Sequence, residues 1–154
     1  MKYFTLKELS ASGTARRMGV DNTPTPVASA NLTALVEAVL DPLRERYGRP
    51  IYVSSGYRCP RLNNAVGGAK TSQHVSGEAV DIYVASARDR AQLFSMIYYL
   101  LPFDQLIWER GTDEDPEWIH VSYREGNNRR QCLRYDGKSY QPFVPRNSAA
   151  SKRV

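Results

Sequence analysis

Short strand-like segments joined by turns constrain the fold of this chain more than any other sequence feature. The predicted strands cover residues 50–55, 79–84, 105–109, 118–123 and 131–135. Turn-forming clusters at 111–116 and 125–128 separate the last three strands. Connections this short are of the antiparallel type, because parallel neighbours need a crossover of about a dozen residues or more. The sequence therefore predicts a mainly antiparallel sheet.

Apolar residues with helical spacing lie between these strands. The longest such segment, 29–47, repeats apolar side chains at i, i+3, i+4 and i+7. Gly48 is the expected end of this helix, and Pro42 is the expected site of a bend. A second helix is predicted between the capping residue Ser86 and Pro102. Helices and strands in separate blocks are typical of the α+β class, here a sheet flanked by helices.

The chain length suits one globular domain. Of the 154 residues 42% are hydrophobic, so residues 1–154 are expected to share one core. The small, polar and finally basic segment 142–154 is expected to be a loose tail. No apolar run reaches the roughly 18 residues of a membrane span, and the first residues lack the apolar stretch of a secretory signal. We therefore expect synthesis in the cytoplasm.

His74 lies in a loop, seven residues before Asp81 in the predicted strand 79–84. A lone loop histidine is usually solvated, and this interpretation stays open for His74. Asp81 favours another, because aspartate is disfavoured in strands and usually has a partner there. Apolar residues share one face of this strand and Asp81 lies on the other. A bend at Gly77 would let His74 face Asp81.

His120 lies within the predicted strand 118–123, on its mixed face. A strand histidine in this position is often a hydrogen-bonded filler, but beside a metal it is the natural third ligand. Two imidazoles and one carboxylate suit Zn²⁺, which in catalytic sites takes three protein ligands and a water. Since the chain has two histidines in all, the pattern predicts one Zn²⁺ held by His74, Asp81 and His120.

Hydrolysis at such a site also needs a carboxylate that takes up and returns a proton. Glu117, three residues before His120, is the predicted general base and acid. The alternatives in the same turn are Asp113, Glu114 and Asp115. Most of this acidic turn is expected to be solvated.

Arg58 and the two cysteines are the other residues with potential chemistry. Arg58 follows a predicted strand directly, where it could hold a carboxylate or stabilise an oxyanion. An exposed loop arginine is the alternative interpretation. Cys59 and Cys132 lack the C-x-x-C spacing of a structural zinc site and are expected to be small buried side chains. With both histidines binding metal, neither cysteine has a histidine left to activate it.

Four motifs follow one another between residues 55 and 120. They are Ser-Gly-Tyr-Arg at 55–58, Asn-Asn-Ala-Val-Gly-Gly at 63–68, S-x-H-x-x-G-x-A-x-D at 72–81 and Glu-Trp-Ile-His at 117–120. Together they resemble the zinc D-alanyl-D-alanine carboxypeptidase family, over roughly residues 30–123. This family includes phage endolysins, cell-wall carboxypeptidases and D,D-dipeptidases, and it shares its fold with the signalling domain of hedgehog. The ten-residue motif is the most specific of the four.

The resemblance implies a hedgehog/DD-peptidase-like fold and a site for one Zn²⁺. His74, Asp81 and His120 would be the ligands. Glu117 would act as general base and then as general acid, and Arg58 would polarise the scissile carbonyl or hold the substrate.

The chain departs from the family at one position of the implied site. Family members often carry a further histidine just upstream of the last ligand, and this chain has none left. Any such role is absent or passes to another group, for which Trp118 and Tyr123 are the candidates. Ser72 and Gln105 are expected to support the ligands or to contact substrate.

The resemblance implies hydrolysis of an amide bond in the stem peptides of peptidoglycan. A monomeric phage or prophage endolysin, acting at the wall after release, fits a single domain with a net charge of +5. A D,D-carboxypeptidase or dipeptidase that trims terminal D-Ala is the alternative enzyme. A non-catalytic zinc-binding structural or interaction module is the alternative outside the enzymes. The late basic residues are expected to form a solvated face, not a nucleic-acid site: Arg124, Arg129, Arg130, Arg134 and Lys138.

Overall fold

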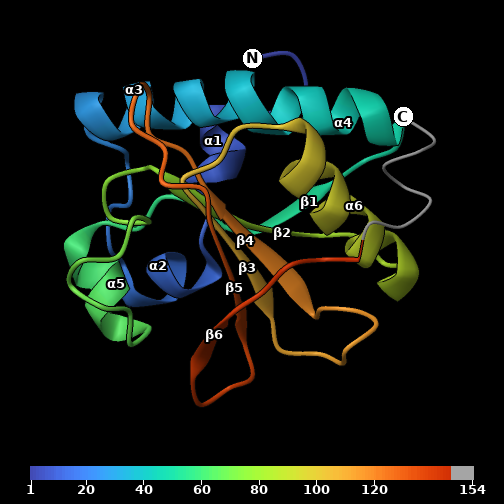
Figure 1. Ribbon diagram of the computed structural model, residues 1–154. Coiled ribbons are helices and arrows are strands. Elements are labelled where there is room, and N and C mark those ends of the chain that lie inside the picture. Colours follow the sequence, from blue (N-terminus) through green and yellow to red (C-terminus); the bar gives the residue numbers. More distant parts are fainter. Residues whose placement is uncertain (147–154) are drawn as a thin grey trace.

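The structure is a computed structural model that describes residues 1–146, and its centre is a six-stranded sheet (Figure 1). The helical segments are α1 (Leu6–Leu9), α2 (Gly13–Met18), α3 (Pro26–Leu35), η1 (Val36–Leu40), α4 (Asp41–Tyr47), α5 (Pro60–Ala65) and α6 (Ala87–Leu100). The strands are β1 (Tyr52–Ser55), β2 (Ala79–Tyr83), β3 (Gln105–Glu109), β4 (Trp118–Ser122), β5 (Gln131–Tyr135) and β6 (Tyr140–Pro142). The predicted α+β class, a sheet flanked by helices, is confirmed.

The strand order is β1-β2-β4-β3-β5-β6, and four of its five pairings are antiparallel. The exception is β5, which pairs with β3 in parallel. The turn after β4 is short but does not join neighbours, because β3 already occupies one side of β4 and β2 the other. The chain therefore crosses the end of β3 to the side of β3 away from β4. There β5 runs parallel to β3. The prediction of a mainly antiparallel sheet is correct, although this connection is not a hairpin.

The long predicted helix is present, with a local change of helix type before Pro42. The helix starts at Pro26 and continues through the π-helical segment η1 to Tyr47. Proline has no N–H to donate and its ring clashes with the carbonyl four residues earlier. Widening of the helix over η1 accommodates this proline. The helix ends at Gly48, which has a φ of 77° as a left-handed C-cap.

One face of the sheet is apolar and packs against helices. Figure 1 shows α3, η1 and α4 as one continuous helix across the top of the view, with α6 below it and with α2 and α5 at the lower left. The buried strand residues on this face are Val80, Ile82, Leu106, Trp108, Ile119 and Val121. They form one core with the apolar side of the helices. The opposite face of β2, β4 and β3 carries polar side chains. Within residues 1–146, no helix has the length and apolar character needed to cross a membrane.

The described part of the expected loose tail is attached to the rest of the fold. The Phe143 N–H donates to the Cys132 carbonyl at 3.0 Å, and its ring packs edge-on against Phe94. The Tyr99 hydroxyl donates to the carbonyl of Pro145 at 2.8 Å. Residues 147–154, the remainder of that prediction, lie outside the described residues.

Gly77 makes the bend that the sequence predicts before β2. Its φ is 75°, a left-handed conformation, and a Cβ atom here would lie 2.5 Å from the carbonyl oxygen of Ala28. We expect Gly77→Ala to lower the free energy of unfolding more than Gly67→Ala. Gly67 is the matched control, since its φ is 77° but a Cβ atom there meets nothing within 4 Å. The left-handed strain alone costs about 1–2 kcal/mol, and the clash with Ala28 should add about 1 kcal/mol or more. Urea unfolding measures both; equal losses would contradict the close approach.

Candidate metal centre

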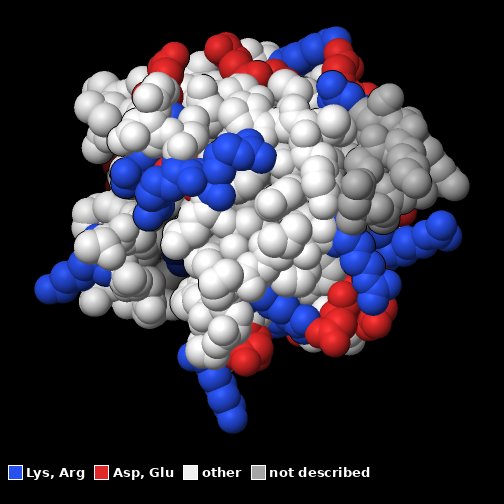
Figure 2. Space-filling view, viewed as in Figure 1, with Lys and Arg blue, Asp and Glu red and all other residues white. Residues whose placement is uncertain are grey.

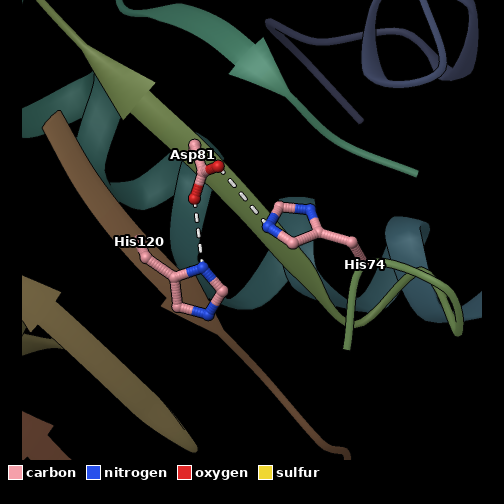
Figure 3. Close-up of side chains that lie close together, drawn as sticks. All are labelled: His74, Asp81 and His120. Atoms are coloured by element: carbon pink, nitrogen blue, oxygen red, sulfur yellow. Dashed lines mark hydrogen bonds and ion pairs between the residues drawn. The ribbon is translucent and has the colours of Figure 1, made fainter. Parts of the chain in front are cut away.

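The pairing of β2 with β4 places Asp81 directly opposite His120. Directly paired residues point to the same side of a sheet, so both side chains enter the polar face. His120 Nδ1 lies 3.0 Å from Asp81 Oδ1. Figure 3 shows the two side chains turned toward each other, with His74 reaching the same point from the loop before β2.

His74 is held in one orientation by the backbone of the loop after β1. Its Nδ1 lies 2.7 Å from the Gly56 carbonyl oxygen. A carbonyl can only accept, so Nδ1 carries the proton and the lone pair of Nε2 points away from Gly56. Nε2 lies 3.5 Å from Asp81 Oδ2. Burial lowers the pKa of His74, despite the opposing attraction of Asp81, and keeps the ring neutral.

The three side chains fit a Zn²⁺ ion. One ligand atom from each of His74, Asp81 and His120 lies within 4.8 Å of the other two. Ligands about 2.0–2.1 Å from a tetrahedral Zn²⁺ stand roughly 3.4 Å apart, which is close to the separations found here. Burial alone would raise the pKa of Asp81, but its contacts with His120 and His74 outweigh that effect and hold this pKa well below its usual range. Both the neutral Nε2 of His74 and the ionised carboxylate are in the protonation states that zinc binds.

Arg58, which the sequence analysis expected to hold a carboxylate or stabilise an oxyanion, or else to be an exposed loop residue, lies at the wall of the cavity. The Arg58 side chain lines the cavity in front of the three ligands, and its backbone N–H donates to the His74 carbonyl at 3.0 Å. Burial lowers the pKa of Arg58, and the charge of Asp81 opposes that change. Its Nε is buried and meets no acceptor among the described residues. A buried donor without a partner is costly, so the fold leaves the hydrogen bonds of the Arg58 guanidinium incomplete.

The cavity in front of the ligands has a volume of about 730 Å³. The three predicted supporting residues differ in their relation to it. Ser72 and Gln105 both line the cavity. The Ser72 hydroxyl accepts the His74 N–H at 3.2 Å, and the Gln105 amide donates to Gln131 at 2.9 Å. Trp118 is half-buried and does not line the cavity.

Glu117 is not brought to the cavity. Its side chain is exposed and absent from the cavity lining, and its N–H donates to the Glu109 carbonyl at 2.9 Å. Glu117 lies in the bend just before β4, and this bend leaves its side chain in solvent, outside the cavity that His120 lines. The alternatives Asp113, Glu114 and Asp115 also lie outside this cavity.

A carboxyl group that the sequence analysis did not single out lies in the cavity instead. Glu109, the last residue of β3, is half-buried and lines it. Burial raises the pKa of Glu109 to about 7, with a smaller opposing effect of His120 and a reinforcing one of Asp81. The sequence could have indicated the position of Glu109. This residue ends a predicted strand, just before a turn that leads to the strand of His120. Pairing the two strands across that turn would have placed Glu109 beside the site.

Most of the late basic residues serve the fold. Four of the five have partners: Glu78 for Arg124, Asp104 for Arg129, backbone carbonyls for Arg130 and Asp113 for Arg134. Figure 2 shows Lys and Arg side chains in separate groups on this face, with Asp and Glu beside several of them. On the face shown, the Lys and Arg side chains form no continuous basic stripe of the kind that nucleic-acid-binding proteins present.

Both cysteines are free thiols that pack against the core. Burial raises the pKa of Cys132 to about 12, so its thiol stays protonated near neutral pH. This agrees with a packing role.

A cavity with two histidines and one aspartate converging at its wall is an arrangement typical of zinc hydrolases. The comparison with protein families identifies which kind: the model of the family Peptidase M15 matches residues 2–122. The chain therefore belongs to the peptidase M15 family, the zinc D-Ala-D-Ala carboxypeptidase-like peptidases, as its motifs predicted. Members of this family are zinc enzymes, and His74, Asp81 and His120 form the corresponding possible metal site. No curated protein matches the chain.

Asp104 anchors the His74 loop to the sheet, and its ionisation should affect stability. Gln73 donates to its carboxylate at 3.0 Å and Arg129 at 2.7 Å. Burial would raise the pKa of Asp104, but the bonds from Arg129 and Gln73 outweigh it and lower this pKa to about 2. A lowered pKa means that the stabilisation is present above about pH 4 and is lost as the pH falls toward 2.

We expect Asp104→Asn to cost about 2 kcal/mol of unfolding free energy at pH 6, from a shift of nearly two pKa units. The difference from the wild type should shrink as the pH is lowered from 5 to 3. Urea unfolding at several pH values measures this. A difference independent of pH would show that the Asp104 carboxylate has no special role.

Proposed function

We propose that this chain is a zinc peptidase that hydrolyses an amide bond in the stem peptides of peptidoglycan, as a phage or prophage endolysin does. The observation that carries the proposal is the convergence of His74, Asp81 and His120 beside an open cavity, in a chain of the peptidase M15 family. The sequence leads us to expect that it is made in the cytoplasm and acts at the cell wall after release.

The residues of the cavity suit amide hydrolysis. A Zn²⁺ held by His74, Asp81 and His120 would polarise the scissile carbonyl and make a water molecule more acidic. The unpartnered Nε–H of Arg58 would donate to the substrate carbonyl oxygen and stabilise the negative charge that develops on it. The Gly56 carbonyl accepts a hydrogen bond from the Nδ1–H of His74, which leaves Nε2 free for the metal.

Arginines at the cavity favour a substrate with carboxylates. Arg124 and Arg129 line the cavity, and each retains N–H groups beyond its ion pair with Glu78 or Asp104. Peptidoglycan stem peptides carry free carboxylates along and at the end of the chain. The same arginines would also hold the terminal carboxylate of a D-Ala residue, which supports the D,D-carboxypeptidase or dipeptidase as the second candidate.

The first test is metal content. We expect the wild-type protein to bind one Zn²⁺ per chain, and His74→Ala and Asp81→Asn to bind far less, because the chain has no spare histidine to replace a lost ligand. Elemental analysis after dialysis measures this. The matched control is Glu114→Gln, which removes the charge of an exposed carboxyl outside the cavity, and this variant should retain the metal. Full zinc content in His74→Ala would refute the ligand set.

The second test is digestion of purified peptidoglycan with the zinc-loaded protein, with and without chelator, followed by mass spectrometry. We expect new peptide amine and carboxyl ends that the chelator suppresses. Cleavage inside the stem peptide or its cross-link identifies an endopeptidase, and release of D-Ala alone identifies a carboxypeptidase. If no new ends form, the protein is not a peptidoglycan hydrolase, and a non-catalytic zinc module becomes the better explanation.

A further inference from the structure

We propose that Glu109, not Glu117, is the catalytic carboxyl group that moves the proton during peptide hydrolysis; this inference rests on the proposed function. Glu109 lies on β3, the strand that pairs with the His120 strand β4. Both side chains are on the same face of the sheet and line the same cavity. The sequence motifs assign no role to Glu109.

The strand register places Glu109 beside the metal ligands. In the β3–β4 pairing, Ile107 lies opposite His120 and Glu109 lies opposite Trp118. Ile107 and Glu109 are two residues apart on one strand, so both point to the face that carries His120. Glu109 and His120 are therefore diagonal neighbours, a separation that long side chains bridge. Glu117 has no such placement, since it precedes β4 and its exposed side chain lies outside the cavity lining.

Glu109 is also the one carboxyl of the described cavity lining that is free for a substrate. The cavity has two acidic residues in the described part of the chain, Asp81 and Glu109. Asp81 is engaged by both histidines. No hydrogen bond or ion pair joins the Glu109 carboxyl to another described residue. Half-buried and without a partner, this carboxyl lacks a structural role that would explain its position at the site.

The proton transfer follows from this placement. The oxygen of a water molecule bonds to the carbonyl carbon while one of its protons passes to the Glu109 carboxylate. Glu109 then donates this proton to the amide nitrogen as the C–N bond breaks, so the nitrogen leaves as an amine. The second proton of the water remains on the new carboxyl group, which ionises to solvent. Arg58 donates to the carbonyl oxygen throughout, so the two residues act on different atoms.

The test compares two isosteric variants, Glu109→Gln and Glu117→Gln, on the peptide bond found by the digestion experiment. General acid–base groups contribute about 10²–10⁴-fold, so kcat of Glu109→Gln should fall by that factor while KM changes little. Glu117→Gln should stay within about threefold of the wild type, as exposed substitutions do. Zinc content should remain one per chain in both variants, which separates proton transfer from loss of metal.

A leaving-group comparison distinguishes proton transfer from a structural effect. The loss in Glu109→Gln should be smaller for an anilide substrate with an electron-poor ring than for the peptide, because a weakly basic amine needs less protonation to leave. Thermal unfolding should show both variants folded. If Glu117→Gln loses kcat and Glu109→Gln does not, the assignment is overturned.

A readout without hydrolysis keeps the inference separate from the proposed function. The visible absorption spectrum of the Co²⁺-loaded protein reports groups that contact the open coordination position. We expect Glu109→Gln to change this spectrum and its pH dependence, and Glu117→Gln to leave both unchanged. If the wild type cuts no peptidoglycan, the proposed function fails, yet the spectra still decide whether Glu109 faces the reaction position. Spectra identical to the wild type in both variants would overturn the placement of Glu109.

Discussion

The contact between Asp81 and His120 across β2 and β4 is the interaction on which the rest of the site depends. Side chains alternate along strands, so a slip of β2 by one residue would turn Asp81 into the core and Val80 into the cavity. The apolar face of the sheet forbids such a slip, because its buried residues would become exposed. The hydrophobic core thus sets the register that makes the metal site possible.

The sequence allowed much of this arrangement to be predicted, and the placements that it did not predict have a common cause. The hypothesis that His74, Asp81 and His120 converge came from one strand aspartate, one bend and the scarcity of histidine. The same reasoning chose Glu117 by proximity along the chain, where only strand pairing distinguishes it from Glu109. The parallel position of β5 was missed for the same reason, since no local pattern states which strands are neighbours. Local chemistry is readable from the sequence; partners across a sheet are not.

The site contains buried polar groups without hydrogen-bond partners, which folded proteins ordinarily avoid. Arg58 Nε is buried without an acceptor among the described residues, and the half-buried Glu109 carboxyl makes no hydrogen bond or ion pair within the same part of the chain. Such groups cost stability, and the apolar core and the Asp104 network offset that cost elsewhere. In the roles proposed for them, Arg58 would donate to the carbonyl oxygen and Glu109 would accept a proton beside the possible metal site, which would give this cost a function.

The parallel strand β5 has a consequence for how specificity is encoded. The family match ends at residue 122, after the last metal ligand, whereas Gln131, Leu133 and Tyr140 of the cavity lining follow it. Chemistry and one wall of the cavity therefore belong to successive stretches of the chain, and the second stretch is a terminal β5–β6 hairpin at the open margin of the sheet. Side-chain changes on that hairpin would reshape this wall of the cavity without altering the three residues of the possible metal site. The architecture thus makes substrate preference a separately evolvable, and separately engineerable, trait.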